Sequence, residues 1–519
     1  MTVSPGRGCT LVVIVALIAL PMLPAAAQQP QPRRGGTLRI AHIGEPPTLD
    51  QHWTTAVITG DIMHNVNEGL FALTSKYEPR PLLAEKWTIS PDRLTHTFTL
   101  RRGVKFHNGK DLTSEDVKAS LERWARLVSR FRAMFVGVTI TAPDPQTVVL
   151  KLPEPNALLL VALAFPGQSA MIFPKEAIDE AGTGQIRRFI GTGPYRFVER
   201  LPDRHVRLDR YDGYAARSEQ PDGQAGRKHA YFDSILFIPV PDAAVRIAGV
   251  KRGDYHFGAA IPSDEYDRLR ADPDIVPALV SVPSWLGAIF NHRTGLMTNR
   301  KIRQAFQAAL DQEAVMQAAY GNRRFWQINP GLMPRDHPMW TDAGKEFVNQ
   351  KNPARARQLL AEAGYKGEPV RWLTTTEYAD FGTAAQVTKP MLERAGFTVD
   401  LQVVDWATLI ARRSRPELYD VFITSFIFVP DPTLMLVLQS TWPGWYDNRD
   451  MNAMMTLLRR HADPKVRQEL WGRMQKLWYE DAGTIKFGEY FGLQLHRKEL
   501  KGYLNVPTQV WWNSWLEGR

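Results

Sequence analysis

Short stretches of the chain alternate between bulky and small polar residues. In residues 95–100 threonine alternates with larger side chains, which predicts a half-buried strand. Residues 37–41 and 397–406 predict two further strands by the same criteria. The chain therefore contains β-structure that is distributed along its length.

Other stretches repeat apolar residues every three or four positions. Such a face follows Thr113, which forms an approximate capping box with Asp116 and so marks the start of a helix. Asn352 and Asp463 precede two more helices, each with proline at the first helical position. Helices that intermingle with strands indicate an α/β fold, and Gly191–Pro194 and Pro283–Ser284 are candidate domain boundaries.

The N-terminus has the pattern of a cleavable secretory signal. Arg7 precedes an apolar run of ten residues, which ends before two prolines and the small residues Ala25–Ala27. A membrane anchor is the alternative, but a span needs about 20 apolar residues. We predict a signal peptide over residues 1–27, a flexible leader over 28–34 and a fold that begins near Gly35.

Composition narrows the class of protein. A length of 519 residues predicts about three domains, or two if one is large. The 64 basic and 54 acidic residues give a net charge of only +10 and no long run of like charge, so we expect no nucleic-acid partner. The single cysteine, Cys9, lies in the predicted signal peptide, which leaves no disulfide or thiolate metal ligand in the mature chain.

Enzyme motifs are incomplete wherever they begin. Residues 191–196 start like a dinucleotide loop, but Arg196 replaces the third glycine and Pro194 removes a backbone N–H. Residues 167–171 resemble a nucleophile elbow without its closing glycine, so we interpret them as a loop. The 12 histidines are dispersed. We expect no metal, no cofactor and no catalytic activity.

Three features remain open between a structural and a functional role. Asp431 lies between two prolines and either closes a turn or ends a strand at a cleft. Trp406 follows a predicted strand and belongs either to a core or to a ligand platform. Arg413, with Arg412 beside it, either lies on a solvated face or holds an anionic group.

One long segment resembles a known family. Residues 84–110, AEKWTISPDRLTHTFTLRRGVKFHNGK, and the LTSEDVK that follows at 112–118 are similar to family 5 of the extracellular solute-binding proteins, the dipeptide- and oligopeptide-binding components of ABC importers. The similarity continues through 191–197, 299–305, 361–365, 404–406 and 431–432. It covers essentially the whole mature chain.

The resemblance implies a periplasmic clamp of two lobes built from three domains, of which the first is discontinuous in sequence. The implied first domain comprises residues 35–73, 192–283 and 490–519. The second comprises 74–191 and the third 284–489. Such a protein is expected to act as a monomer that closes on its solute and then delivers it to a permease in the inner membrane.

The resemblance also implies where the solute binds. By residue-wise match the cleft draws on residues 51–54, on strand ends in the third domain and on the segment around residue 426. The implied ligand-binding residues are Trp53, Tyr378, Trp406, Arg413, Thr424, Ser425, Phe426, Phe428 and Asp431.

The chain departs from the peptide-binding pattern at one of these positions. In peptide-binding relatives an acidic residue pairs with the free amino terminus of the ligand, and here the match places Phe428 at that position. A buried ammonium group without a partner costs several kcal/mol. We therefore predict a small organic solute, such as a modified peptide, a sugar-like or an opine-like compound. A conventional dipeptide or oligopeptide receptor is the alternative, and a secreted hydrolase is a remote one.

Overall fold

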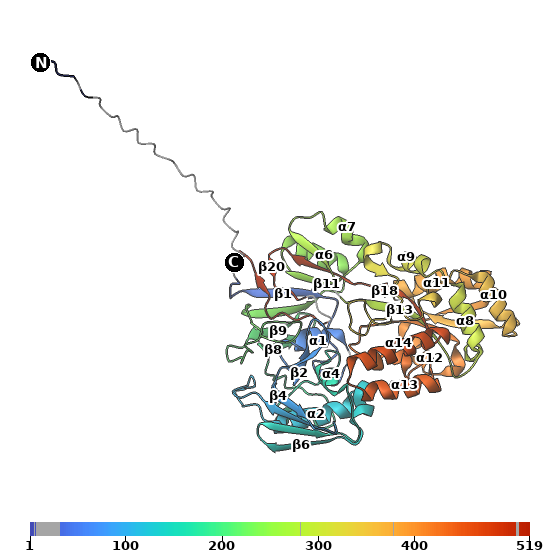
Figure 1. Cartoon of the computed structure of the whole chain (residues 1–519), viewed down its shortest axis with the longest axis horizontal. Helices are drawn as coiled ribbons and strands as arrows, with labels where there is room; N and C mark the ends of the chain where they lie inside the picture. The colour runs from blue at the N-terminus through green and yellow to red at the C-terminus, as the bar shows by residue number, and fades with distance from the viewer. Residues whose placement is uncertain are drawn as a thin grey trace.

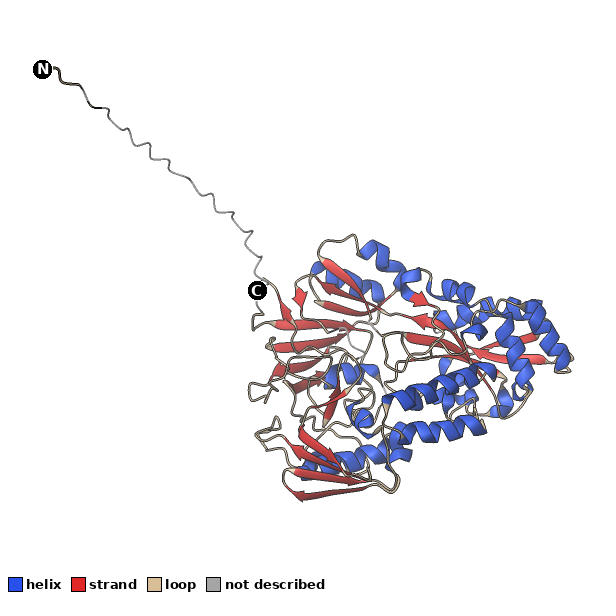
Figure 2. Ribbon diagram, viewed as in Figure 1, coloured by secondary structure: helices blue, strands red, loops and turns tan. Residues whose placement is uncertain are grey.

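The computed structural model describes most of the chain, and Figure 1 shows its course. The predicted signal peptide and leader lie almost entirely outside the described part. Helices and strands intermingle throughout (Figure 2), which confirms the predicted α/β fold. The described residues are 1–4, 6, 32–54, 56–280, 282–376, 378–504 and 508–518.

A seven-stranded sheet joins the start, the middle and the end of the chain. Its strand order is β12-β19-β11-β1-β10-β9-β8, with β1 parallel to both β10 and β11. Leu38 and Ile40 of β1 are completely buried in its core. The strands are β1 (Thr37–His42), β8 (Tyr195–Leu201), β9 (His205–Arg210), β10 (Ser234–Pro239), β11 (Phe257–Ile261), β12 (Ile275–Leu279) and β19 (Leu493–Arg497).

A four-stranded sheet in the order β4-β5-β7-β6 packs against helix α2 (Ser114–Leu127). Phe98 on the sheet and Leu121 and Trp124 on the helix are completely buried, so the predicted strand over 95–100 and the helix after Thr113 are both confirmed. The strands are β4 (Ala84–Ile89), β5 (Thr95–Leu100), β6 (Thr139–Asp144) and β7 (Thr147–Lys151).

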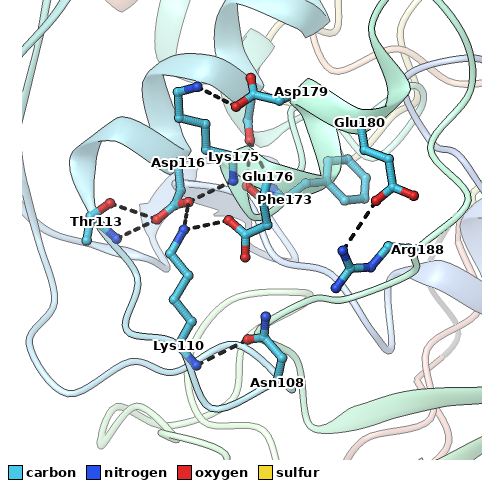
Figure 3. A network of polar contacts seen from close by, with 11 residues as sticks. Asn108, Lys110, Thr113, Asp116, Phe173, Lys175, Glu176, Asp179, Glu180 and Arg188 are labelled. Carbon is cyan, nitrogen blue, oxygen red and sulfur yellow. Dashed lines mark hydrogen bonds and ion pairs between the residues drawn. The ribbon is translucent and has the colours of Figure 1, made fainter.

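The start of α2 is fixed by a polar network that Figure 3 shows. The Asp116 carboxylate accepts hydrogen bonds from the Thr113 backbone N–H and hydroxyl at 3.0 and 2.7 Å, completing the predicted capping box. Lys110 donates to Asp116 at 2.7 Å and to Glu176 of α5 (Lys175–Ala181) at 2.8 Å. These residues of the family-like segment therefore dock α2 onto α5.

A six-stranded sheet in the order β14-β18-β13-β17-β15-β16 forms the other half of the molecule. One face, with Trp372 and Ile423, packs on α8 to α11, and the opposite face, with Leu373 and Phe422, packs on α13 and α14. The strands are β13 (Ser284–Phe290), β14 (Trp326–Gln327), β15 (Pro369–Thr374), β16 (Thr398–Val403), β17 (Val421–Phe426) and β18 (Ile485–Tyr490). The helices are α8 (Arg300–Ala309), α9 (Gln312–Tyr320), α10 (Pro353–Glu362), α11 (Ala379–Arg394), α13 (Arg449–Arg460) and α14 (Pro464–Glu480).

The remaining helices and short strands connect these three layers. Among the described helices none has both the length and the apolar character of a membrane span. The connecting elements are α1 (Val57–Met63), α3 (Ser129–Arg132), α4 (Leu159–Ala164), α6 (Ala243–Arg252), α7 (Tyr266–Leu269), α12 (Trp406–Arg413), β2 (Phe71–Leu73), β3 (Pro79–Pro81), β20 (Leu500–Lys501) and β21 (Trp515–Leu516).

The seven- and four-stranded sheets lie on one side of the molecule and the six-stranded sheet on the other (Figure 1), and we call these two parts the first and the second lobe. The lobes touch along the edge where α3 and the segment before α4 meet α13. Ala157 donates its backbone N–H to the Arg459 carbonyl at 2.8 Å. Arg130 donates to the Leu434 carbonyl at 3.0 Å, and Glu154 forms an ion pair with Arg460.

Candidate functional site

A pocket opens between the two lobes, and the space within it, including the part open to solvent, is about 840 Å³. Its lining comes from the surroundings of α1, from the loop that follows α4, from the crossover before β13 and from the chain just after β17. Residues far apart in sequence thus converge on one space at the junction of both lobes. Ligand sites in proteins favour such concave junctions.

The pocket wall is apolar with a few uncharged polar groups. Val57, Phe165, Ile427 and Phe428 provide apolar surface, and Ile427 remains 54% exposed at the rim. The polar lining consists of amide and hydroxyl side chains. Among the described lining residues none is charged. The described part of the chain also holds no cluster of three or more metal-ligating side chains.

A hydrogen-bonded chain of side chains backs the pocket wall where α1 meets the loop after α4. His64 Nε2 lies 2.9 Å from the Ser169 hydroxyl, and His64 Nδ1 lies 3.2 Å from the Gln51 side-chain nitrogen. Asn67 donates to Gln51 Oε1 at 2.9 Å. Burial lowers the pKa of His64 to about 4, so the ring is neutral near pH 7.

The Ser169–His64 contact brings together a hydroxyl and an imidazole, as in a nucleophilic catalytic pair, but the groups around them do not activate the hydroxyl. The Ser169 hydroxyl donates to the Pro166 carbonyl at 2.7 Å, and His64 Nδ1 faces the Gly60 carbonyl at 2.8 Å. Within the described chain no carboxylate orients the imidazole as a triad requires. The segment 167–170 is a turn and loop, as its sequence predicts. The arrangement positions the wall of the pocket.

Phe428 lines the pocket and packs into an aromatic cluster that joins the lobes. Its ring centroid lies 4.4 Å from Tyr77 of the first lobe and 5.9 Å from His337 of the second. Burial and Asp336 raise the pKa of Tyr77 to about 12, and burial lowers the pKa of His337 to about 4. Neither ring is charged near pH 7.

Trp53 lies between two lining residues, Gln51 and Thr54, and is 42% exposed. Its backbone N–H donates to the Asp50 carbonyl at 3.1 Å, which shapes the turn before α1. Trp53 itself is not among the lining residues.

Tyr378 and Trp406 meet at one edge of the six-stranded sheet. They follow the parallel strands β15 and β16, and their rings lie 5.0 Å apart in an edge-to-face arrangement. Tyr378 is 46% exposed, while Trp406 is half-buried against both cores of the second lobe. Neither residue lines the pocket described above.

The last three residues of β17 lead from the sheet to the pocket. Thr424 is buried opposite Gly287 of β13, and Ser425 hydrogen-bonds the Tyr490 side chain. Phe426 stacks on Trp285 with ring centroids 4.2 Å apart. These contacts fix the direction in which the chain continues to Phe428.

Asp431 is buried and its carboxylate is engaged within the protein. It accepts hydrogen bonds from the Thr433 backbone N–H and hydroxyl at 3.0 and 2.7 Å, and it forms an ion pair with Arg467 of α14. These partners are those of a turn that is anchored to a helix.

Arg413 ends α12 with its guanidinium over two aromatic rings. The guanidinium carbon lies 5.8 Å from the ring centroid of Phe422 and 5.7 Å from that of Trp442. Burial lowers its pKa, and in the described part of the chain no carboxylate pairs with it. It lies outside the pocket lining.

Of the residues predicted for the cleft, Phe428 lines the pocket, and so do Gln51 and Thr54 of the predicted segment 51–54; Trp53, Tyr378, Trp406, Arg413 and Asp431 are not among its lining residues. The loop 165–169 supplies a continuous part of the wall but was not among the predicted site residues. Its Pro-Gly turn after a short apolar helix was the available signal, but nothing local indicates which surface that turn faces.

Comparison with known sequences gives consistent matches. The model of a family described as "Bacterial extracellular solute-binding proteins, family 5 Middle" matches residues 78–446. The "Probable peptide ABC transporter periplasmic-binding protein y4tO" of Sinorhizobium fredii is 29% identical over 479 residues, covering 89% of this chain and 90% of the relative. The "Glutathione-binding protein GsiB" of Salmonella choleraesuis is 25% identical with the same coverage.

Solved structures share the fold. A periplasmic binding protein, AgaA, from A. tumefaciens R10, determined with agropinic acid, superposes with a TM-score of 0.78 at 23% identity, covering 93% of this chain and 99% of that one. A dipeptide-binding protein from Pseudoalteromonas sp. SM9913 in complex with Met-Leu gives a TM-score of 0.77 at 20% identity, covering 93% and 100%. At these identities the likeness shows the two-lobed fold and leaves the solute open.

Proposed function

The chain belongs to family 5 of the bacterial extracellular solute-binding proteins, which serve ABC transporters, and we propose that it captures a small organic solute that lacks a free α-amine. The observation that carries this proposal is the position of Phe428. Its side chain lines the pocket at the position where the family resemblance places the amine-binding acid. The described lining offers no charged group that could take the place of that acid.

The physical reason is desolvation. An α-ammonium group that enters this wall would lose its water and meet aromatic and aliphatic surface, which costs several kcal/mol. Asp431 does not restore the missing partner, because Arg467 and Thr433 already engage its carboxylate. The uncharged end of a modified peptide, a sugar-like or an opine-like compound meets no such penalty.

A conventional peptide receptor is the second candidate. It is favoured by the relatives, since the Sinorhizobium protein is named for peptides and the Pseudoalteromonas structure contains Met-Leu. The two candidates differ in the partner that they require for an α-amine, and so they can be separated by experiment.

We further propose that the protein binds without catalysis. The Ser169–His64 pair lacks an orienting carboxylate within the described chain, and Ser169 donates to a backbone carbonyl. Product formation from a bound solute, followed by mass spectrometry, would revive the hydrolase alternative.

Solute binding is proposed to close the lobes about two crossovers, near 191–194 and 283–285. Strand membership supports the three proposed domains, because the seven-stranded sheet draws on the three segments assigned to the first one. At the first crossover, a Cβ on Gly191 would lie 2.0 Å from the Val66 carbonyl, so only glycine permits this close passage. A solute that contacts both lobes favours the closed form, which the permease then recognises.

We also propose export through cleavage after Ala27 and a monomer in the periplasm. N-terminal sequencing of the mature protein tests the cleavage: a start near Gln28 is expected, and an intact or lipidated N-terminus would contradict it.

The direct test of the solute class is the compound that copurifies with the protein. The protein is unfolded, and the released solute is analysed by mass spectrometry before and after treatment with an amine-selective reagent. We expect a mass that does not shift on treatment. A labelled di- or oligopeptide would support the peptide receptor instead.

A further inference from the structure

We propose that Gln168 determines which solute binds, through hydrogen bonds between its side-chain amide and an uncharged amide, lactam or hydroxyl group of the solute. The inference deepens the proposed function and rests on it, because it concerns the same pocket. It arises from a loop that no motif assigns to ligand binding.

The loop 165–169 has an unusual concentration of pocket contacts. All five of its consecutive residues line the pocket, and they form the part of the wall that belongs to the first lobe after α4. Gly167 permits the tight turn, since a Cβ there would lie 2.8 Å from the Phe165 ring. The loop is therefore folded against its own aromatic residue and lines the pocket.

The backbone of Gln168 is held in a conformation that residues other than glycine seldom adopt. Its φ of +53° lies in the left-handed region. The conformation is fixed by Trp124 Nε1, which donates to the Gln168 carbonyl at 2.7 Å from the completely buried face of α2. Strained residues of this kind concentrate at ligand sites, where the surrounding structure enforces a defined side-chain direction.

The next residue fixes the loop a second time. Ser169 donates to the Pro166 carbonyl at 2.7 Å and lies 2.9 Å from His64 Nε2. The main chain of Gln168 is thus anchored on one side to the core of the four-stranded sheet and on the other to α1. Only the side chain of Gln168 is then free to change its conformation.

The side-chain amide of Gln168 is available, whereas several of its polar neighbours already have protein partners. The residue is half-buried, and in the part of the chain that the structure describes its amide makes no hydrogen bond. Several other polar lining groups already have protein partners. The Gln51 carbonyl oxygen accepts from Asn67, the Thr54 hydroxyl accepts from the Ala56 N–H, the Thr59 hydroxyl donates to the Thr48 carbonyl, and Ser284 bonds Tyr490.

The chemistry of a carboxamide defines the class of group that it recognises. It presents one acceptor and two donors without a charge, and so it is complementary to an amide, a lactam or a hydroxyl. A solute that presents such a group satisfies Gln168 in an otherwise apolar enclosure. A solute without it leaves the amide unpaired when the lobes close, which disfavours that solute.

The test compares three variants by titration calorimetry with agropinic acid and N-acetylated Met-Leu as probes. Gln168→Glu retains the shape but adds a charge and removes two donors. Gln168→Gly removes the side chain and suits the left-handed backbone. Gln317→Glu, on the exposed surface of α9 outside the pocket, is the matched control for the added charge.

We expect Gln168→Glu to weaken binding of the better probe by about tenfold or more, and Gln317→Glu to leave it unchanged. We expect Gln168→Gly to weaken binding while its unfolding temperature stays the same or rises, which a merely structural role would not produce. Unchanged affinity in both Gln168 variants would overturn the inference and leave the proposed function intact. Failure of the unmodified protein to bind either probe, together with tight binding of free Met-Leu, would overturn the proposed function and the inference with it.

Discussion

The rings of Phe428 and Tyr77 lie with their centroids 4.4 Å apart, and they come from opposite lobes. Tyr77 is in the turn between β2 and β3 and has a φ of +63°. One residue therefore both lines the pocket and contributes to the contact between the lobes. Replacement of Phe428 should alter the solute preference and the stability of the closed form together.

The first prediction concerns Phe428→Asp. The introduced carboxylate supplies a partner for an α-amine, so affinity for free Met-Leu should rise relative to its N-acetylated form, while the copurifying solute should bind more weakly. Phe428→Leu is the control, because it removes the aromatic contact without adding a charge. A loss of affinity for both forms of the peptide to the same extent in both variants would contradict the assignment.

The second prediction concerns Arg413, whose guanidinium lies over the rings of Phe422 and Trp442 and forms no ion pair with a carboxylate in the described chain. If it holds an anionic group of the solute, Arg413→Ala should weaken binding by about 2 kcal/mol or more. The adjacent Arg412→Ala should have little effect. Calorimetry with agropinic acid measures both variants, and equal losses would show that Arg413 has no specific role.

The third prediction concerns the buried ion pair between Asp50 and Arg123, in which Asp50 is followed in sequence by the lining residue Gln51. Asp50 accepts from Arg123 at 3.1 and 2.5 Å and from the Ile186 N–H at 2.9 Å, and both side chains are almost completely buried. Asp50→Asn leaves an unpaired buried cation and should destabilise the protein by about 3 kcal/mol. Asp179→Asn, which breaks an exposed pair with Lys175, should cost less than about 1 kcal/mol in the same urea titration. Similar unfolding midpoints for both variants would contradict this account.

The fourth prediction is a loss of stability in acid. Burial lowers the pKa of His107 to about 4. Its ring contacts two glycines of the first crossover: Nδ1 accepts the Gly191 N–H at 3.3 Å, and Nε2 lies 2.9 Å from the Gly193 carbonyl. Burial also lowers the pKa of His64 and His337 to about 4.

The sign follows from proton binding. Below the unfolded pKa of about 6.5 the unfolded chain binds protons that these neutral imidazoles do not, so stability is full above that pH and falls as the pH drops toward 4. The loss is about 1.4 kcal/mol per pH unit for each histidine. Thermal unfolding between pH 7.5 and 4.5 measures it, and His107→Gln should reduce the slope. A flat profile would show that these imidazoles are not neutral and buried.

Local patterns predicted the elements of the fold well. The helix after Thr113 and the one after Asn352 begin where their caps indicate, because a cap is satisfied within three residues along the chain. The long segment from residue 84 identified the family by its residue identities alone, and local contacts such as those of Lys110 and Thr113 with Asp116 hold part of it together.

The pocket could be predicted only in part, because its contacts are long-range. The alternative readings of Asp431 could not be separated in the sequence, since its partner Arg467 lies on a helix 36 residues away. The Pro-Gly turn in the loop 165–169 could not reveal which surface the loop faces, because the position of the loop depends on Trp124 and His64, which are 44 and 105 residues away from their partners in the loop. The sequence pattern fixes polarity locally, and tertiary packing decides which side chains face the solute.

The most direct test of the central claim, that this pocket excludes a free α-amine, is the dissociation constant of the unmodified, solute-free protein for Met-Leu, measured by titration calorimetry beside its N-acetylated form. With Phe428 in place of an acid, the free dipeptide should bind at least about 30-fold more weakly, which corresponds to about 2 kcal/mol of uncompensated desolvation. Binding of free Met-Leu at about 1 µM or tighter, or a preference for the free over the acetylated form, would contradict the claim.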